Sequence, residues 1–136
     1  MGSPDMAIAC VWRGEFSNEA VNRLQAEAFG HRVLQDDWWG QVNRHSLGWV
    51  CALAETSLVG FVNVAWDGGV HAFVLDTMVA VDYQRRGIAA EMLGICAREA
   101  RNARCEWLHV DFEERLRPLY FDRVGFVGSD AGVMRL

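Results

Sequence analysis

The sequence has no excess of positive charge, no closely spaced cysteines and no long apolar segment, and each absence excludes a class of protein. Its 136 residues carry 18 acidic and 13 basic side chains, which gives a net charge of −5. General nucleic-acid binding requires a basic face and is therefore disfavoured. No apolar run approaches the ~20 residues that span a membrane, and the sequence shows no signal-peptide pattern. These features predict a soluble, cytoplasmic protein that binds neither nucleic acid nor membrane.

The spacing of cysteine and histidine disfavours metal and disulfide chemistry. The four cysteines include no Cys-x-x-Cys pair. Three of them, Cys10, Cys51 and Cys96, lie in apolar runs, where a free thiol behaves as a small buried hydrophobic side chain. The four histidines also lack the spacing of metal ligands. We therefore expect no metal site.

Apolar periodicity and turn residues predict one domain over residues 1–136, of which 1–5 are flexible or vector-derived, with an α+β fold in which helices flank a central mixed sheet. The short connections at 55–56 and 67–69 predict three consecutive antiparallel strands. A crossover helix then places the following strand parallel to its predecessor. The expected strands are 6–12, 47–54, 57–66, 70–81 and 107–112, and the expected helices are 17–30, 87–104 and 115–124. A second helix or an ordered loop is expected in 31–46, and a small strand or hairpin in 126–136.

The most informative segment is the turn Gln84-Arg85-Arg86-Gly87-Ile88-Ala89, between an apolar strand and an amphipathic helix. A helix that begins at a glycine exposes unpaired backbone N–H groups at its positive end, and such groups bind phosphate. The two arginines add positive charge, so the turn predicts a phosphorylated ligand at residues 84–90. An empty structural turn is a weaker alternative, because it would not need the arginines. A dinucleotide-binding motif would have three glycines early in a βαβ unit.

This turn and the order of elements around it resemble the GNAT family of N-acetyltransferases. The family's turn has the signature Gln/Arg-x-x-Gly-x-Gly/Ala, which Gln84, Gly87 and Ala89 match. The similarity includes residues 75–81 before the turn and the terminal Gly-Phe, so it covers essentially residues 6–128. It implies a GNAT-like acyl-CoA N-acyltransferase fold and acetyl-CoA as the cosubstrate, with no metal.

The resemblance also implies where acetyl-CoA binds. Its diphosphate would lie on the backbone N–H groups of the turn, where Gly87 and Ala89 let the backbone approach closely. Its pantetheine arm would pair with the bulged strand before the turn, like an added strand. The implied cofactor-binding residues are Met78, Val79, Val81, Gln84, Arg85, Arg86, Gly87, Ile88, Ala89 and Ala90.

Acetyl transfer to an amine needs a base, an oxyanion donor and often an acid for the departing thiolate. In the family a tyrosine four residues before the terminal Gly-Phe often supplies this acid, but here Phe121 holds that position and Tyr120 precedes it. In one interpretation the last helix is shifted or irregular after Pro118, so that Tyr120 reaches the sulfur. In a second no acid is needed, since a thiol of pKa ~8.5 is a tolerable leaving group. In a third the chain binds acyl-CoA without efficient catalysis.

Asp76 is the leading candidate for the base. It interrupts an apolar strand just before the expected bulge, where the family commonly keeps an acidic or polar group that faces the acceptor. Its alternative role is to cap the bulge or to pair with an arginine. Glu113 and Glu114 follow the neighbouring strand and are better explained as a solvated helix start. His109 and Asp111 share one face of that strand and suggest a proton relay.

The acceptor site is the least defined part of the prediction. Large aromatic side chains are more often core than pocket, but the fold usually builds its acceptor site in the segment that corresponds to residues 31–46. Asp37, Trp38 and Trp39 are therefore the candidate substrate residues, and they would suit an amine or an amino sugar. The net negative charge of the chain favours a cationic small molecule as the acceptor.

The favoured function is acetylation of a small-molecule amine by direct attack on acetyl-CoA in a ternary complex. No cysteine lies in the motifs, so we expect no covalent acyl-enzyme. The alternatives are a non-catalytic acyl-CoA-binding sensor or interaction domain, and a protein N-terminal or lysine acetyltransferase. Antibiotic, polyamine and amino acid acceptors stay open. The oligomeric state stays open too, although homodimers are common in the family.

Overall fold

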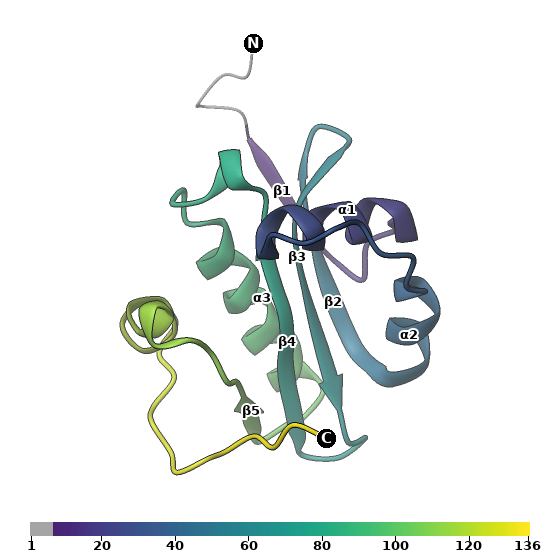
Figure 1. Ribbon diagram of the computed structural model, residues 1–136. Helices are drawn as coiled ribbons and strands as arrows, with labels where there is room; N and C mark the ends of the chain where they lie inside the picture. Colours follow the sequence, from purple (N-terminus) through teal and green to yellow (C-terminus); the bar gives the residue numbers. More distant parts are fainter. Residues whose placement is uncertain (1–6) are drawn as a thin grey trace.

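A computed structural model describes residues 7–136, and the expectations for residues 1–5 and for the first residue of the first strand lie outside this range. Its core is a five-stranded mixed sheet in the order β1-β2-β3-β4-β5 (Figure 1). The first four strands pair antiparallel, whereas β5 pairs parallel with β4, as the sequence predicts. The strands are β1 (Ile8–Trp12), β2 (Ser46–Ala54), β3 (Ser57–Trp66), β4 (His71–Val79) and β5 (Trp107–His109).

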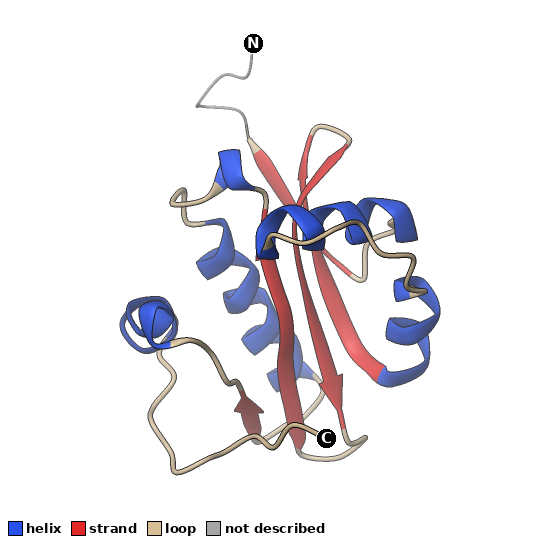
Figure 2. Ribbon diagram, in the orientation of Figure 1, coloured by secondary structure: helices blue, strands red, loops and turns tan. Residues whose placement is uncertain are grey.

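Helices cover both faces of the sheet (Figure 2). On one face lie α1 (Asn18–Phe29) and α2 (Trp38–His45), and on the other lies α3 (Ile88–Asn102). Two buried clusters correspond to these faces: Trp49 and Phe61 pack under α1 and α2, while Val50 and Val62 pack under α3. Successive residues of β2 and β3 therefore point to opposite faces, and both faces are apolar because both are covered.

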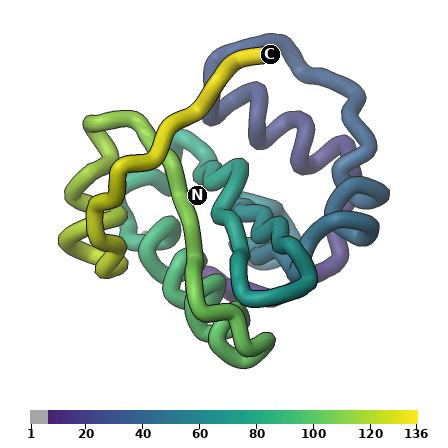
Figure 3. Tube along the Cα trace, turned by 90° about the horizontal axis from the view of Figure 1, so that it is seen from below, coloured from purple at the N-terminus to yellow at the C-terminus, as the bar shows by residue number. Residues whose placement is uncertain are grey.

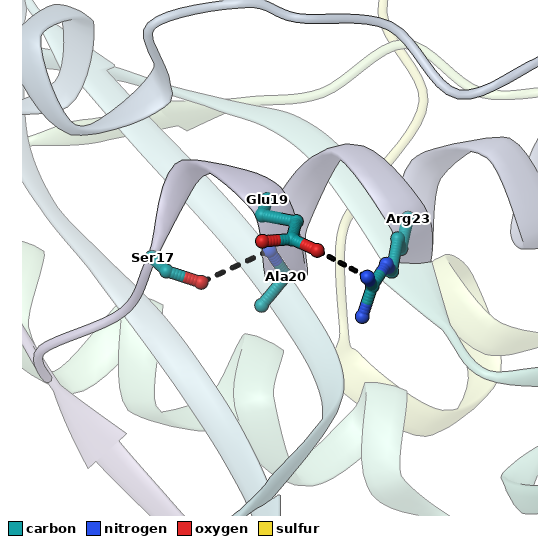
Figure 4. A network of polar contacts seen from close by, with 4 residues as sticks. All are labelled: Ser17, Glu19, Ala20 and Arg23. Carbon is teal, nitrogen blue, oxygen red and sulfur yellow. Dashed lines mark hydrogen bonds and ion pairs between the residues drawn. The ribbon is translucent and has the colours of Figure 1, made fainter.

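The predicted boundaries of α1 are confirmed by its caps. The Ser17 hydroxyl accepts a hydrogen bond from the Ala20 N–H at 3.1 Å, and Gly30 ends the helix with φ 71° and an N–H bond to the Ala26 carbonyl. Figure 4 shows the cap beside an ion pair between Glu19 and Arg23. Both side chains of the pair are about two-thirds exposed, at 66% and 68%, so the pair contributes at most about 1 kcal/mol.

The polar and aromatic segment after α1 forms an ordered connection and then α2. Its anchor is Asn22 of α1, which is 2% exposed. The Asn22 amide donates to the Asp36 carbonyl at 3.0 Å, and its oxygen accepts from the Asp36 N–H at 3.3 Å and from the Trp38 indole N–H at 3.0 Å. A buried amide that is bonded at both ends fixes the start of α2 against α1.

The C-terminal third departs from the sequence prediction in three places. Strand β5 ends at His109 instead of residue 112, and only a short turn of 3-10 helix, η2 (Glu114–Leu116), follows. The last helix is a π-helix, η3 (Pro118–Val124). The predicted strand or hairpin in 126–136 is wrong, because these residues form no strand and run as an extended trace to the C-terminus (Figure 3). Glycines at 128 and 132 favour such an open chain, since glycine weakens strands.

The short β5 leaves much of β4 open on one side. The two strands pair only from His71 with Trp107 to Phe73 with His109, so residues 74–79 have no strand partner on the β5 side. A second short 3-10 helix, η1 (Val81–Tyr83), then leads from β4 to α3. Within residues 7–136, no helix has the length and apolar character needed to cross a membrane.

We predict that Asn22→Ala lowers the free energy of unfolding by about 1–3 kcal/mol, because it leaves the Trp38 indole and both backbone groups of Asp36 without their partner. Urea unfolding followed by tryptophan fluorescence measures the change. The matched control is Asn43→Ala, since Asn43 is exposed and its amide bonds to the Trp39 carbonyl of its own helix. Equal destabilisation by the two variants would contradict an anchoring role for Asn22.

Candidate active site

The open part of β4 contains a β-bulge. Phe61 of β3 faces Met78 and Asn63 faces Leu75, so Val62 is opposite two residues, Asp76 and Thr77. Asp76 has φ 58°, in the left-handed region that costs a non-glycine residue about 1–2 kcal/mol. The bulge that the sequence analysis expected before the turn is therefore present, and it interrupts the alternation of side chains at Asp76.

The Asp76 carboxyl group is partly withdrawn from water. Burial raises the pKa of Asp76, and a hydrogen bond from the Asn63 side chain partly offsets this rise. Asn63 is 1% exposed, and its amide oxygen accepts a hydrogen bond from the Ser46 hydroxyl. The carboxyl group of Asp76 therefore lies near a buried amide that is itself bonded to Ser46 of β2.

A cavity of about 460 Å³ lies between the open part of β4 and the segment after β5. Asp76 and Thr77 line it from the bulge, and Tyr120 lines it from the π-helix. Two more carboxylates, Asp111 and Glu113, line the opposite wall. Phe29 extends from the last turn of α1 to the same cavity, so elements from both faces of the sheet meet there.

Tyr120 is buried beside the bulge, at 3% exposure. Its hydroxyl donates a hydrogen bond to the Thr77 hydroxyl at 3.3 Å, and its ring stacks on Phe112 with centroids 4.5 Å apart. Burial raises the pKa of Tyr120, while the bond to Thr77 acts in the opposite direction. At neutral pH the phenol therefore keeps its proton and can act as an acid.

The π-helix explains how Tyr120 comes to this position. The backbone carbonyl of Tyr120 accepts hydrogen bonds from the N–H groups of Gly125 at 3.0 Å and Phe126 at 2.9 Å. In an α-helix the Gly125 N–H would instead bond to the carbonyl four residues earlier, that of Phe121. In the wider turn of the π-helix, Tyr120 is therefore the hydrogen-bond partner of Gly125, as Phe121 would be in an α-helix. The irregular last helix considered in the sequence analysis is present.

The turn before α3 has the backbone that the phosphate hypothesis requires. Arg85 has φ 63°, and Gly87, the N-cap of α3, has φ 81°. The Gln84 amide donates to the Val79 carbonyl at 3.1 Å and closes the turn back on β4, while the Arg86 guanidinium lies over the Tyr83 ring. The first N–H groups of α3 are therefore presented next to two arginines.

The backbone at the end of β4 points toward the open side of the strand. The Ala80 N–H donates to the Val59 carbonyl of β3 at 2.8 Å, so the groups of its neighbours Val79 and Val81 face away from β3. The Val81 N–H donates to the Glu27 carboxylate of α1 at 2.6 Å. Val79 and Val81 are both residues predicted to bind the cofactor. In this structure the Val79 carbonyl is bonded to the Gln84 side chain and the Val81 N–H to the Glu27 side chain.

Sequence reasoning missed three residues of this region: Thr77, Glu27 and Arg123. The Arg123 guanidinium of η3 lies 3.5 Å from the position that a Cβ atom would have on Gly87. Glu27 and Val81 are 54 residues apart, and Thr77 and Tyr120 are 43 residues apart. Nothing local in the sequence marks such pairs. Only the bulge prediction could have drawn attention to Thr77.

Comparison with known proteins identifies the family. A family model described as the acetyltransferase (GNAT) family matches residues 12–126. The chain belongs to the GNAT family. It is therefore an acetyltransferase by family, and its α+β fold is the one that the sequence analysis expected.

Solved structures of acetyltransferases have a similar fold. A probable acetyltransferase of unknown function from methicillin-resistant Staphylococcus aureus is 17% identical, with a TM-score of 0.79 over 96% of this chain and 98% of that one. A GNAT-family acetyltransferase of Streptococcus pneumoniae is 21% identical, with a TM-score of 0.77 and the same shares covered. AAC(6')-Iy, in complex with the bisubstrate analogue CoA-S-monomethyl-acetylneamine, is 16% identical, with a TM-score of 0.73 over 96% of this chain and 97% of that one. A search of curated proteins found no match.

The thiols of this GNAT protein are poorly suited to covalent catalysis. Burial raises the pKa of Cys51 and of Cys96 to about 12, and burial together with the Glu91 carboxylate raises the pKa of Cys10 to about 12. A protonated thiol is a weak nucleophile. Among the residues that the structure describes, no three His, Cys, Asp or Glu side chains gather in a way that could hold a metal ion.

The residues predicted for the acceptor do not line the cavity. Helix α2 packs on β2 and β3, away from the open side of β4. Trp38 is 4% exposed and bonded to Asn22, so it belongs to the core, while Trp39 is 39% exposed. The Asp37 carboxylate caps α2 through the Gly40 N–H at 3.0 Å, and this bond lowers the pKa of Asp37.

We predict that the stability of the wild type relative to Asp76→Asn falls as pH rises above about 4. Because the pKa of Asp76 is raised in the folded state, the folded chain retains a proton that the unfolded chain releases, so unfolding becomes easier as pH rises through this window. Urea unfolding of both variants between pH 4 and 8 measures the difference. Parallel stability curves would contradict the burial of an ionisable carboxyl group at the bulge.

Proposed function

We propose that this GNAT protein is an acetyl-CoA-dependent N-acetyltransferase that modifies the amine of a small molecule by direct attack in a ternary complex. The observation that carries the proposal is the meeting of Tyr120 and Thr77 at the bulge, in a cavity that also contains Asp76. An acid, a candidate base and an open strand edge thus border one space. The neighbouring turn supplies positive charge for a phosphorylated cosubstrate.

Acetyl-CoA supplies the acetyl group as a thioester. In the proposed mode, the N–H groups at the start of α3 and the arginines of the turn hold the diphosphate. The open edge of β4 and the residues that follow it, from Met78 to Val81, pair with the pantetheine arm, as a peptide adds to a sheet edge. For that pairing Gln84 and Glu27 must release the Val79 carbonyl and the Val81 N–H. The CoA complexes of AAC(6')-Iy, which shares the fold, support this choice of cosubstrate.

Asp76 and Tyr120 have complementary proton roles in this proposal. A neutral amine must attack the thioester, and the raised pKa of Asp76 makes its carboxylate a better base than an exposed aspartate. Tyr120 returns a proton to the departing thiolate, for which its protonated phenol is suited. A backbone N–H at the bulge polarises the thioester carbonyl. No side chain needs to carry the acetyl group.

The cavity favours a cationic acceptor. Asp76, Asp111 and Glu113 contribute three carboxylates to its lining, and the one arginine there, Arg115, is paired with Glu113 at 2.8 Å. A small polyamine or amino sugar fits this charge. An acceptor in contact with Asp37 or Trp39 would have to extend across β3 to α2, so a substrate role for these residues stays a prediction, as does a homodimer. Among proteins of the same fold, one aminoglycoside acetyltransferase has been solved in complex with sisomicin.

The test is a screen for product formation by the purified protein. Acetyl-CoA is incubated with aminoglycosides, polyamines, amino acids, and peptides with a free N-terminus or lysine, and acetylated product is detected by mass spectrometry. Turnover is expected on a small cationic amine. Turnover on peptides alone would instead indicate a protein acetyltransferase. Tight CoA binding without product from any acceptor would favour a non-catalytic sensor.

We predict that Tyr120→Phe lowers kcat by about 10²–10⁴-fold with little change in acetyl-CoA affinity, because it removes the acid and keeps the stacked ring. Steady-state kinetics and calorimetric CoA binding separate the two effects. The matched control is Phe121→Tyr, whose ring lies edge-on to Phe112 and outside the cavity lining. Unchanged kcat in Tyr120→Phe would exclude Tyr120 as the acid.

A further inference from the structure

Arg123 brings a positive charge to the phosphate turn from an element remote in sequence. It lies in the last turn of η3, and its Nη2 atom is 3.5 Å from the position of a Cβ atom on Gly87. The Gly87 position is the N-cap of α3, with φ 81°. The left-handed backbone favours glycine at this position, and the absence of a side chain keeps the backbone open to the approach of a ligand.

The charges around Arg123 leave it available to an anion. Within residues 7–136 it forms no ion pair, whereas Arg115 and Arg117, near the start of η3, pair with Glu113 and Glu114. The acidic residue in the first turn of α3 is Glu91, and its carboxylate is turned to the Cys10 thiol of β1 at 3.5 Å. Of the turn's own arginines, Arg86 lies over the Tyr83 ring. Arg123 therefore faces the N-terminus of α3 without a bound carboxylate.

We infer that Arg123 binds the diphosphate of the cosubstrate, together with the first N–H groups of α3. The inference rests on the proposed function, and it goes beyond that function by adding a ligand-binding side chain from the helix that also carries the candidate acid. A guanidinium makes charge-assisted, often bidentate hydrogen bonds with phosphate oxygens, and the helix N-terminus favours the same charge. The diphosphate is the part of CoA that lies at Gly87 in this arrangement.

The same contact gives Arg123 a positioning role. Arg123 and Tyr120 are three residues apart on one short helix, and η3 packs against α3. A phosphate held between α3 and Arg123 fixes η3 at one end, while the bond from Tyr120 to Thr77 fixes it at the bulge. Binding at the turn therefore helps to hold the phenol beside the thioester.

The test is calorimetric binding of CoA and of dephospho-CoA, which lacks the 3′-phosphate, to the wild type, Arg123→Ala and Arg101→Ala at ~0.15 M salt. Arg101 lies in the last turn of α3, roughly 20 Å along the helix from Gly87, and its removal changes the net charge equally. We expect Arg123→Ala to weaken binding of both ligands by about 10- to 100-fold, and Arg101→Ala to weaken it less than about 2-fold. Arg123→Gln repeats the test if the alanine variant does not fold.

Two results would overturn the inference. Equal affinities of Arg123→Ala and Arg101→Ala would show that Arg123 acts only through net charge. A loss seen with CoA but absent with dephospho-CoA would place Arg123 on the 3′-phosphate instead of the diphosphate. Failure of the proposed function is seen separately: a wild type that binds neither CoA nor dephospho-CoA would exclude the cosubstrate, and binding without product in the acceptor screen would exclude catalysis while leaving the test of Arg123 intact.

Discussion

The rest of the site depends on one feature of the sheet: β5 pairs with β4 over a short distance and then separates from it. Only three residues of each strand pair, and beyond them β4 has an unpaired edge that contains the bulge at Asp76 and Thr77. An unpaired edge inside a fold is costly unless its polar groups find partners. The side chains of Gln84 and Glu27 supply two of these partners. A ligand with its own amide groups would replace them.

The π-helix resolves the mismatch of one residue between Tyr120 and the position where the family often has a tyrosine. An α-helix would direct Phe121 toward the bulge, whereas one wider turn directs Tyr120 there. The change costs little elsewhere, because Phe121 still packs against Phe112 and under Arg117. The backbone geometry thus brings Tyr120, one residue before the position of the family's tyrosine, into hydrogen-bond contact with Thr77.

Local features were predictable from the sequence, and long-range contacts were not. Ser17, Gly30 and the Asp67-Gly68-Gly69 turn act through neighbours within a few residues, so their effect follows from residue type. The length of β5 depends on where its pairing with β4 ends, which strand propensity cannot report. The bond of Glu27 with Val81 and the position of Arg123 beside Gly87 depend on how α1 and η3 are placed in space.

The bond from Glu27 to Val81 links the two halves of the proposed reaction. Helix α1 contributes Glu27 to the edge where the pantetheine arm would pair, and Phe29, two residues later, to the wall of the acceptor cavity. An arm that takes the Val81 N–H would replace Glu27 as its partner, while α1 stays packed on β4 through side chains such as Leu24. Occupation of the donor edge by the arm would therefore remove a contact of the same helix whose last residue, Phe29, borders the cavity.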